Sequence, residues 1–525
     1  MMFFALSKQA GQIAVTNADV QEKFPGLVQE ITSNLGAFLP ELILAVGVMW
    51  VIMADLFTRR ERSRRMGFHA FAFVAVALVS VICHGFSGDQ ELFRGMIVDD
   101  GFGAFFKVLL LVGTLICIPM VMMTRSFDGR RMGEFYGLLL GSVLGMFLMV
   151  TAKNMIMFFL GIEFASYTSY LLTGYLKGDR RGAEGALKYV IYGSVASGAM
   201  AYGLSLLYGL TGSLDMADVA QGLIVSRTTD VTVLIAGLLC FAGFGYKIAA
   251  FPMHFWSPDV YEGAPIPFTA FLSVISKAAG FAVLLRFAEG MVGTGNWELT
   301  LSNGDVVGVD WPLVVGVISA LTMTVGNFAA LFQRNLKRLL AYSSIAHAGY
   351  LLMGIAALAP GAENAIPGWQ AILFYLVAYL FMNLGAFLVV SIIAEKTGRE
   401  TLDAYRGLGS RSALLSVALG IFLISLIGLP PTGGFTGKVQ LIKAVVDDGQ
   451  IWLALVAVVN TVVSVYYYAR IIRLMFLEES DDTSKVPLSA PVSAFVVLMI
   501  VPVLWLGVFF GSTVDFIRDL TLTLG

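Results

Sequence analysis

The stretch VTVLIAGLLCFAGFGYKIAAFPMHFW, from Val231 to Trp256, is long and apolar enough to cross a bilayer, yet it carries a lysine, Lys247, well inside it. A transmembrane helix needs about 20 mostly apolar residues. A charged side chain at the centre of such a helix costs roughly 2.5–3.5 kcal/mol on insertion scales, so an ionisable residue there indicates a functional site by default. Lys247 is therefore the first candidate functional residue.

Three further charges repeat this anomaly. Lys277 lies midway through PFTAFLSVISKAAGFAVLLRF, and Lys438 follows the interrupted segment SLIGLPPTGGFTGK. A carboxylate, Glu163, occupies the middle of NMIMFFLGIEFASYTSYLL. Four ionisable groups within apolar spans predict a path for ions through the membrane.

The composition defines the class of protein. Hydrophobic residues make up 58% of the 525 residues and charged residues only 13%, which is typical of an all-α polytopic membrane protein. The three cysteines stand singly and lack the paired spacing of an iron–sulfur or zinc site. Neither GxGxxG after a strand nor GxxxxGK[ST] occurs, so we expect no metal, nucleotide, flavin or nicotinamide site in this chain.

Apolar runs of about 20 residues predict fourteen membrane spans. The N-terminus lacks the basic and apolar regions of a secretory signal peptide, so it is interpreted as part of the mature protein. The predicted division is an extramembrane or interfacial segment (1–37), spans one to three (38–133), a first five-helix unit with spans four to eight (134–291), a second with spans nine to thirteen (311–477), and span fourteen (485–525).

The distribution of basic residues predicts the orientation. The loops that follow odd-numbered spans hold 22 of the 34 lysines and arginines, and the segments on the opposite side hold seven. The loops with the larger number are predicted to face the cytoplasm. This matches the positive-inside bias and places both termini outside. Two of the five remaining cations, Lys107 and Arg286, lie near span ends, where we expect their long side chains to reach the interface.

Spans seven and twelve share the pattern G-F-x-x-K, at Gly243–Lys247 and Gly434–Lys438. Five spans separate them, and an odd offset reverses the direction of travel, so the two five-helix units are predicted to be inverted repeats of the transporter type. Prolines near both lysines predict that the two spans are broken, since irregular backbone at membrane depth is tolerated where it is buried or lines a hydrated cavity. A simple kink for packing is the alternative.

Glu163 and Lys247 suggest a mechanism. Burial disfavours a charged lysine, whereas a carboxylate about 4 Å away stabilises it by about 4 kcal/mol at an effective dielectric constant of 20. A lysine whose partner approaches or withdraws can therefore bind or release a proton. A static ion pair is the alternative for any single pair. His347, in span ten, is a candidate proton relay, although a buried neutral histidine with a structural hydrogen bond is the common case.

The stretch WSPDVYEGAP, from Trp256 to Pro265, followed by SKAAGF, from Ser276 to Phe281, resembles subunit N of bacterial proton-pumping NADH:quinone oxidoreductase, respiratory complex I. The resemblance extends over most of the chain, through LGIE at 160–163, AYSSIAH at 341–347 and GLPPTGGFTGK at 428–438. Asp259 and Glu262, within the first stretch, are interpreted either as loop caps or as contacts to a partner.

This resemblance implies a fourteen-helix fold with two inverted five-helix repeats and broken spans seven and twelve. It also implies proton transfer by the residues that match the family positions, namely Glu163, Lys247, Lys277, His347 and Lys438. The family subunit binds no redox cofactor, because NADH, FMN, iron–sulfur clusters and quinone belong to partner subunits. The implied partners are antiporter-like and small helical subunits and membrane lipids, with no nucleic acid, in the bacterial inner membrane.

The leading hypothesis is therefore a non-redox subunit of a proton-translocating oxidoreductase. Quinone reduction elsewhere in the complex would act on the Glu163/Lys247 pair, and Lys277 and His347 would relay protons to Lys438. One alternative is a subunit of a sodium/proton antiporter, which the sodium dependence of the flux distinguishes. Another is a membrane scaffold that anchors a soluble redox arm.

Overall fold

The structure is a computed structural model that describes residues 32, 34–86, 88–127, 130–225, 230–292, 299–300, 306–307, 310–358, 366–480 and 484–520. The predicted N-terminal segment 1–37 lies almost wholly outside these residues, as does most of the loop that precedes Trp311.

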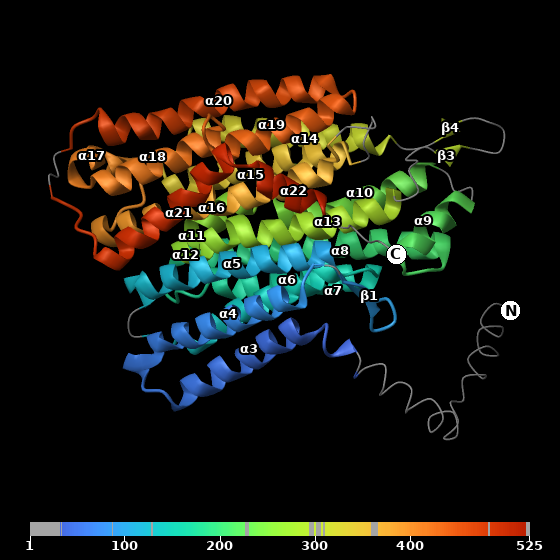
Figure 1. Ribbon diagram of the computed structural model, residues 1–525, viewed down its shortest axis with the longest axis horizontal. Coiled ribbons are helices and arrows are strands. Elements are labelled where there is room, and N and C mark those ends of the chain that lie inside the picture. The colour runs from blue at the N-terminus through green and yellow to red at the C-terminus, as the bar shows by residue number, and fades with distance from the viewer. Residues whose placement is uncertain are drawn as a thin grey trace.

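The described chain is predominantly helical, and the helices lie side by side with their axes roughly parallel (Figure 1). In chain order the helices are α3 (Leu39–Phe57), η1 (Arg60–Arg65), α4 (Met66–His84), α5 (Gly101–Met123), η2 (Arg125–Phe127), α6 (Gly133–Thr151), α7 (Met155–Thr173), α8 (Arg180–Thr211), α9 (Met216–Val225), α10 (Asp230–Ile248), α11 (Ser257–Gly263), α12 (Ile266–Phe271), η3 (Leu272–Ser276), α13 (Lys277–Val292), α14 (Trp311–Leu331), α15 (Leu336–Ala356), α16 (Gly368–Thr397), η4 (Leu402–Tyr405), α17 (Leu408–Arg411), α18 (Ala413–Ile427), α19 (Gly433–Asp447), α20 (Ile451–Phe476), α21 (Ala490–Val508) and α22 (Gly511–Arg518).

The predicted number of spans is confirmed. Within the described residues, 13 helical segments are long and apolar enough to cross a membrane, and the shorter apolar helix α18 lies in the predicted span twelve. Two small antiparallel hairpins accompany the helices. β1 (Asp89–Leu92) pairs with β2 (Ile97–Asp100), and β3 (Leu299–Thr300) pairs with β4 (Val306–Val307). Figure 1 shows both hairpins at the same end of the helices.

Spans seven and twelve are both broken, as predicted. α10 ends at Ile248, and a stretch of turns leads to the short helix α11. α18 ends at Ile427, and the chain resumes as α19 at Gly433. Pro252 and the pair Pro430 and Pro431 lie in the two interruptions, where the missing backbone donors of proline prevent a continuous helix.

The two five-helix units share a way of packing. In the first unit, a Cβ added to Gly145 of α6 would lie 2.7 Å from the backbone nitrogen of Ala165 in α7. In the second, a Cβ added to Gly326 of α14 would lie 2.5 Å from the backbone nitrogen of Ala346 in α15. Glycine at both crossings lets the backbones touch, as expected between membrane helices. Spans four and five thus pack like spans nine and ten, which is consistent with the inverted repeat.

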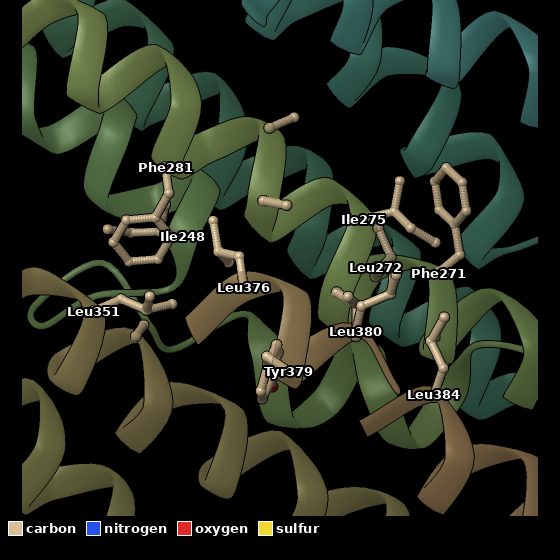
Figure 2. Close-up of a cluster of buried hydrophobic side chains, with 14 of the residues drawn as sticks. Ile248, Phe271, Leu272, Ile275, Phe281, Leu351, Leu376, Tyr379, Leu380 and Leu384 are labelled. Atoms are coloured by element: carbon tan, nitrogen blue, oxygen red, sulfur yellow. The ribbon is translucent and has the colours of Figure 1, made fainter. Parts of the chain in front are cut away.

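Span eight is the most enclosed span, with every residue of its most apolar 18-residue window buried. It consists of α12, the π-helical turn η3 and α13. Figure 2 shows that Leu380 and Leu384 of α16 lie beside Phe271, Leu272 and Ile275 in the first half of this span. Leu376 of α16 lies further along, beside Ile248 of α10 and Phe281 of α13. Because lipid tails are as apolar as leucine, this packing stabilises the fold mainly through close van der Waals contact.

The prediction that Lys107 and Arg286 reach the interface is wrong. The Lys107 ammonium lies 2.7 Å from a Glu41 carboxylate oxygen, and both side chains are buried. Arg286 donates two hydrogen bonds to Asp100, at 2.6 and 3.0 Å, and a third to the Val150 carbonyl. Both cations are thus held inside the protein by buried carboxylates.

Candidate functional site

Lys247 lies in the last turn of α10, directly before the break in span seven, and its side chain is buried. The ammonium donates a hydrogen bond to the Ser166 hydroxyl of α7 at 3.1 Å. Two carbonyls in the last turn of α10 are hydrogen-bonded locally, since the Ala250 amide donates to the Gly245 carbonyl and the Trp256 indole donates to the Tyr246 carbonyl. The break therefore places a lysine at a buried helix end without leaving these backbone groups unpaired.

The predicted pair of Glu163 and Lys247 is not in direct contact. No ion pair joins Lys247 to a carboxylate among the described residues, and Glu163 instead accepts a hydrogen bond from the Ser197 hydroxyl of α8. Ser166 follows Glu163 by three residues, so the carboxylate and the hydroxyl that binds the lysine share one face of α7, about one turn apart. The two charged groups are neighbours separated by a serine.

Lys277 begins α13, immediately after the π-helical turn of span eight. Such turns inside helices frequently occur at functional sites. The Lys277 ammonium donates a hydrogen bond to the Ser344 carbonyl of α15. Gly280, one turn further along α13, faces span seven, because a Cβ added there would lie 3.2 Å from Cγ of Lys247. The side chain of Lys247 therefore packs against α13 about one turn beyond Lys277.

His347 is enclosed by tyrosines. Its Nδ1 lies 2.5 Å from the Tyr375 hydroxyl of α16, and its Nε2 lies 3.5 Å from the Tyr468 hydroxyl of α20. The Tyr468 hydroxyl also hydrogen-bonds the Ser343 hydroxyl. Both ring nitrogens thus face hydroxyl groups that can donate or accept a proton, which is the arrangement a relay requires.

Lys438, in α19, lies at the break in span twelve. Its ammonium donates to the carbonyls of Ile427 and Leu426 at 2.8 and 3.2 Å, the last two residues of α18. A helix C-terminus carries a partial negative charge and favours a cation. The ammonium also lies 4.3 Å from the centre of the Tyr350 ring, close enough for a cation–π contact.

One helix connects these groups. Ser344, His347 and Tyr350 follow one another at intervals of three along α15, so they share one face. Ser344 binds Lys277, and Tyr350 covers Lys438, with His347 between them. The other two site residues connect to this row through Lys247. Ser166 links Lys247 to α7, the helix that carries Glu163, and Gly280 links Lys247 to α13, the helix that carries Lys277. The five predicted site residues are thus connected in one row.

Sequence reasoning missed the hydroxyl groups of this row. Ser166 could have been found, since it lies three residues after Glu163 in a helix whose carboxylate was already a candidate. The tyrosines Tyr375 and Tyr468 carry no signal, because many aromatic residues of this chain lie in spans and only the fold brings these two to His347. Lys337 was not among the candidate residues, but it is buried in the first turn of α15 and its ammonium lies 3.0 Å from a Glu400 carboxylate oxygen.

Asp259 and Glu262 of α11 contact neighbouring helices within the chain. Arg338 of α15 lies 2.5 Å from Asp259 and 3.0 Å from Glu262, and Lys188 of α8 lies 2.6 Å from Asp259. Partial burial alone would raise the pKa of Asp259, but hydrogen bonds from Lys188 and Arg338 hold this pKa below its usual value. These ion pairs attach the short helix after the first break to both five-helix units.

The described residues contain no group of three or more His, Cys, Asp or Glu side chains that could hold a metal ion. The charged groups of the site are instead lysines, one carboxylate and one histidine, separated by hydroxyl groups. Broken helices, similarly packed helix pairs and a buried charged row are features of a polytopic membrane protein of the transporter type.

Comparisons with known proteins agree with this class. Residues 152–464 match the family model "NADH:quinone oxidoreductase/Mrp antiporter, TM". Similar chains are the NADH-quinone oxidoreductase subunits N of Anaeromyxobacter sp., 45% identical over 87% of this chain and 90% of the relative, and of Chlorobium chlorochromatii, 40% identical over 94% and 96%. The chain therefore belongs to the NADH:quinone oxidoreductase/Mrp antiporter family, within its subunit N group.

Solved structures support the fold. A chain of respiratory complex I from Thermus thermophilus with bound aureothin aligns with a TM-score of 0.74 and 32% identity, over 91% of this chain and 98% of the other. A chain of the Mrp complex from Dietzia sp. aligns with a TM-score of 0.75 over 92% and 96%, but its 21% identity shows the fold alone.

Proposed function

We propose that this chain is a proton-translocating membrane subunit of an NADH:quinone oxidoreductase and that it contains no redox centre. The observation that carries the proposal is the row from Glu163 to Lys438, in which three buried lysines and a histidine are linked by hydroxyl, carbonyl and aromatic contacts. A static role would require three desolvated ammonium groups, none of which has a carboxylate ion pair in the described part of the chain, and burying such groups without a partner is costly.

In this mechanism the first step occurs at Lys247. A charged Glu163 about one turn from the Ser166 hydroxyl stabilises the protonated lysine, and loss or displacement of that charge releases the proton. Ser166 offers the ammonium a neutral acceptor. Quinone reduction in partner subunits would supply the energy that changes the charge at Glu163.

Protons then pass toward the second unit. Lys277 and His347 are the proposed intermediate carriers, and Tyr375 and Tyr468 can reorient their hydroxyls around the histidine. Lys438 is the terminal carrier, because the C-terminus of α18 stabilises its charged form. Release at that end completes one transfer.

The wider assignments belong to the same proposal. NADH, FMN, iron–sulfur clusters and quinone would bind to partner subunits, which include antiporter-like and small helical chains. The complex would reside in the bacterial plasma membrane, with both termini of this chain on the external side. The units 134–291 and 311–477 would each form one half of the proton path.

The test is proton pumping by the purified complex in proteoliposomes. Lys247→Ala is expected to lower the number of protons moved per electron while the complex remains assembled. Lys443→Ala is the matched control, because this lysine is half-exposed on the same helix as Lys438 and pairs only with Asp447 among the described residues. An unchanged ratio of protons to electrons in Lys247→Ala would remove this lysine from the mechanism.

A further inference from the structure

A cavity of about 460 Å³ lies between the ends of α5 and α16 and the start of α21, away from the row of lysines. Its volume is within the roughly 300–1,000 Å³ typical of small-molecule sites. α5 and α16 end beside this cavity and α21 begins there. The loops next to these three helix ends belong to the side of the molecule that is rich in arginine and lysine. The cavity therefore opens near one predicted membrane surface.

One part of the lining is cationic. Arg64, Arg125 and Lys396 face the cavity together with one carboxylate, Glu395, which leaves two positive charges in excess. Arg64 donates a hydrogen bond to the Thr124 carbonyl at 3.1 Å, and this contact anchors it at the end of α5. The cavity thus has a fixed cation and two exposed ones, an arrangement that favours an anionic group.

The other part of the lining is apolar. Met122, Ile392, Leu488 and Val492 line the same cavity, and all but Leu488 belong to membrane-spanning helices. A free phosphate ion would contact only the cations. A phospholipid would contact both parts, with its phosphate on the cations and an acyl chain along the apolar wall.

A neighbouring cavity of the same volume carries the opposite charge. It lies around Lys337 and is lined by four carboxylates, Asp179, Glu262, Glu395 and Glu400, against two cations, Arg181 and Lys337. Its negative excess and polar lining disfavour an anionic lipid. Of these two cavities, only the one at α21 combines excess cations with an apolar wall.

We propose that the cavity between α5, α16 and α21 binds an anionic phospholipid. Basic pockets between membrane helices on the cytoplasmic side are known to accept anionic head groups. Arg125 and Lys396 bind the phosphate together with Arg64, and Met122, Ile392 and Val492 contact an acyl chain. The lipid joins span three to spans eleven and fourteen, which are far apart in the sequence.

The experiment uses the purified complex in vesicles that contain either phosphatidylglycerol or phosphatidylcholine with a photoreactive group in one acyl chain. After illumination, mass spectrometry locates the labelled peptides. We expect phosphatidylglycerol to label peptides with Met122, Ile392 or Leu488 at least tenfold more than phosphatidylcholine does. The double variant Arg125→Gln and Lys396→Gln is expected to weaken phosphatidylglycerol binding about 30-fold, as for loss of two interfacial cations.

The matched control is the double variant Arg59→Gln and Arg399→Gln, which removes two exposed cations of the same side that do not line the cavity. This control should retain the lipid preference. Equal labelling by the two lipids, or cross-linking of the cavity residues to another subunit in place of lipid, would overturn the proposal. If the first variant fails to assemble, the comparison of the two lipids in the unmodified complex still decides the question.

Discussion

At the scale of single residues, the serine between Glu163 and Lys247 is the most informative contact of the site. Ser166 provides the only hydrogen bond found for the Lys247 ammonium among the described residues. A hydrogen bond to a charged group contributes roughly 1.5–3 kcal/mol. The position of the lysine proton therefore depends on this hydroxyl as well as on the carboxylate.

Replacing this hydroxyl should slow proton transfer. We expect Ser166→Ala to reduce the pumping rate roughly tenfold or more, since each 1.4 kcal/mol corresponds to a factor of ten. Ser169→Ala is the control, because its buried hydroxyl lies one turn further along α7, donates to the Ala165 carbonyl and hydrogen-bonds no lysine within the described residues. Pumping by reconstituted complexes measures both. Equal rates in the two variants would show that Ser166 has no part in the transfer.

The sequence predicted the charged residues of the site but not their partners. A lysine in an apolar span can be recognised from the sequence, because placing its charge in the membrane costs free energy whatever surrounds it. Tyr375 and Tyr468 are ordinary aromatic residues of apolar helices until the fold places them beside His347. Lys107 and Arg286 were misinterpreted because position along a span does not tell whether a side chain faces lipid or a buried carboxylate.

At the scale of elements, the broken helices work as supports for lysines. Gly428 follows the last residue of α18 with φ of +87°, a left-handed conformation that costs an L-residue about 1–2 kcal/mol. A Cβ at this position would also lie 2.8 Å from Cδ of Lys438. The break in span twelve thus requires a glycine for its backbone and for the path of the lysine side chain.

Gly428→Ala should therefore impair pumping as well as stability. Gly398→Ala is the control, because Gly398 ends α16 with φ of +66° and an added Cβ would meet nothing within 4 Å. Both variants should lose about 1–2 kcal/mol of stability from backbone strain, seen as a lower temperature of thermal inactivation. Only Gly428→Ala should lower the number of protons per electron. A similar loss of pumping in both would mean that strain alone is responsible.

The buried pair of Arg286 and Asp100 joins α13 to the start of α5. Removing one partner of such a pair leaves an uncompensated charge and typically costs 3–5 kcal/mol. We expect Arg286→Leu to reduce the amount of assembled complex in native gels, and the additional change Asp100→Asn to restore part of it. Assembly of Arg286→Leu at the normal level would show that water or another cation compensates Asp100.

At the scale of the whole molecule, the apolar spans and broken helices could be predicted because the length of an apolar run and the position of a proline are properties of a short stretch of sequence. The crossings of α6 with α7 and of α14 with α15 could be predicted only in part. The glycines Gly145 and Gly326 are visible in the sequence, but which backbone each one touches depends on the fold. The orientation in the membrane rests on the distribution of arginine and lysine alone.

Thiol labelling tests that orientation. In a Cys83→Ser background, a cysteine at Gln90 in the first hairpin should react with an impermeant maleimide in intact spheroplasts, because this exposed position lies on the predicted external side. A cysteine at Arg62 in η1 should react only in inverted vesicles. The opposite pattern would reverse the direction of every span and place both termini in the cytoplasm.

The identity of the transported ion is a property of the whole path. A sodium ion needs several oxygen ligands with negative character, whereas this row presents three ammonium groups and one histidine, with Glu163 as the only carboxylate. We therefore expect NADH-driven pumping in proteoliposomes to continue at the same rate when sodium is replaced by potassium, and a protonophore to abolish the gradient. A flux that rises and saturates with sodium would instead favour a sodium/proton antiporter, in which ammonium groups would have to yield their positions to the metal ion during each cycle.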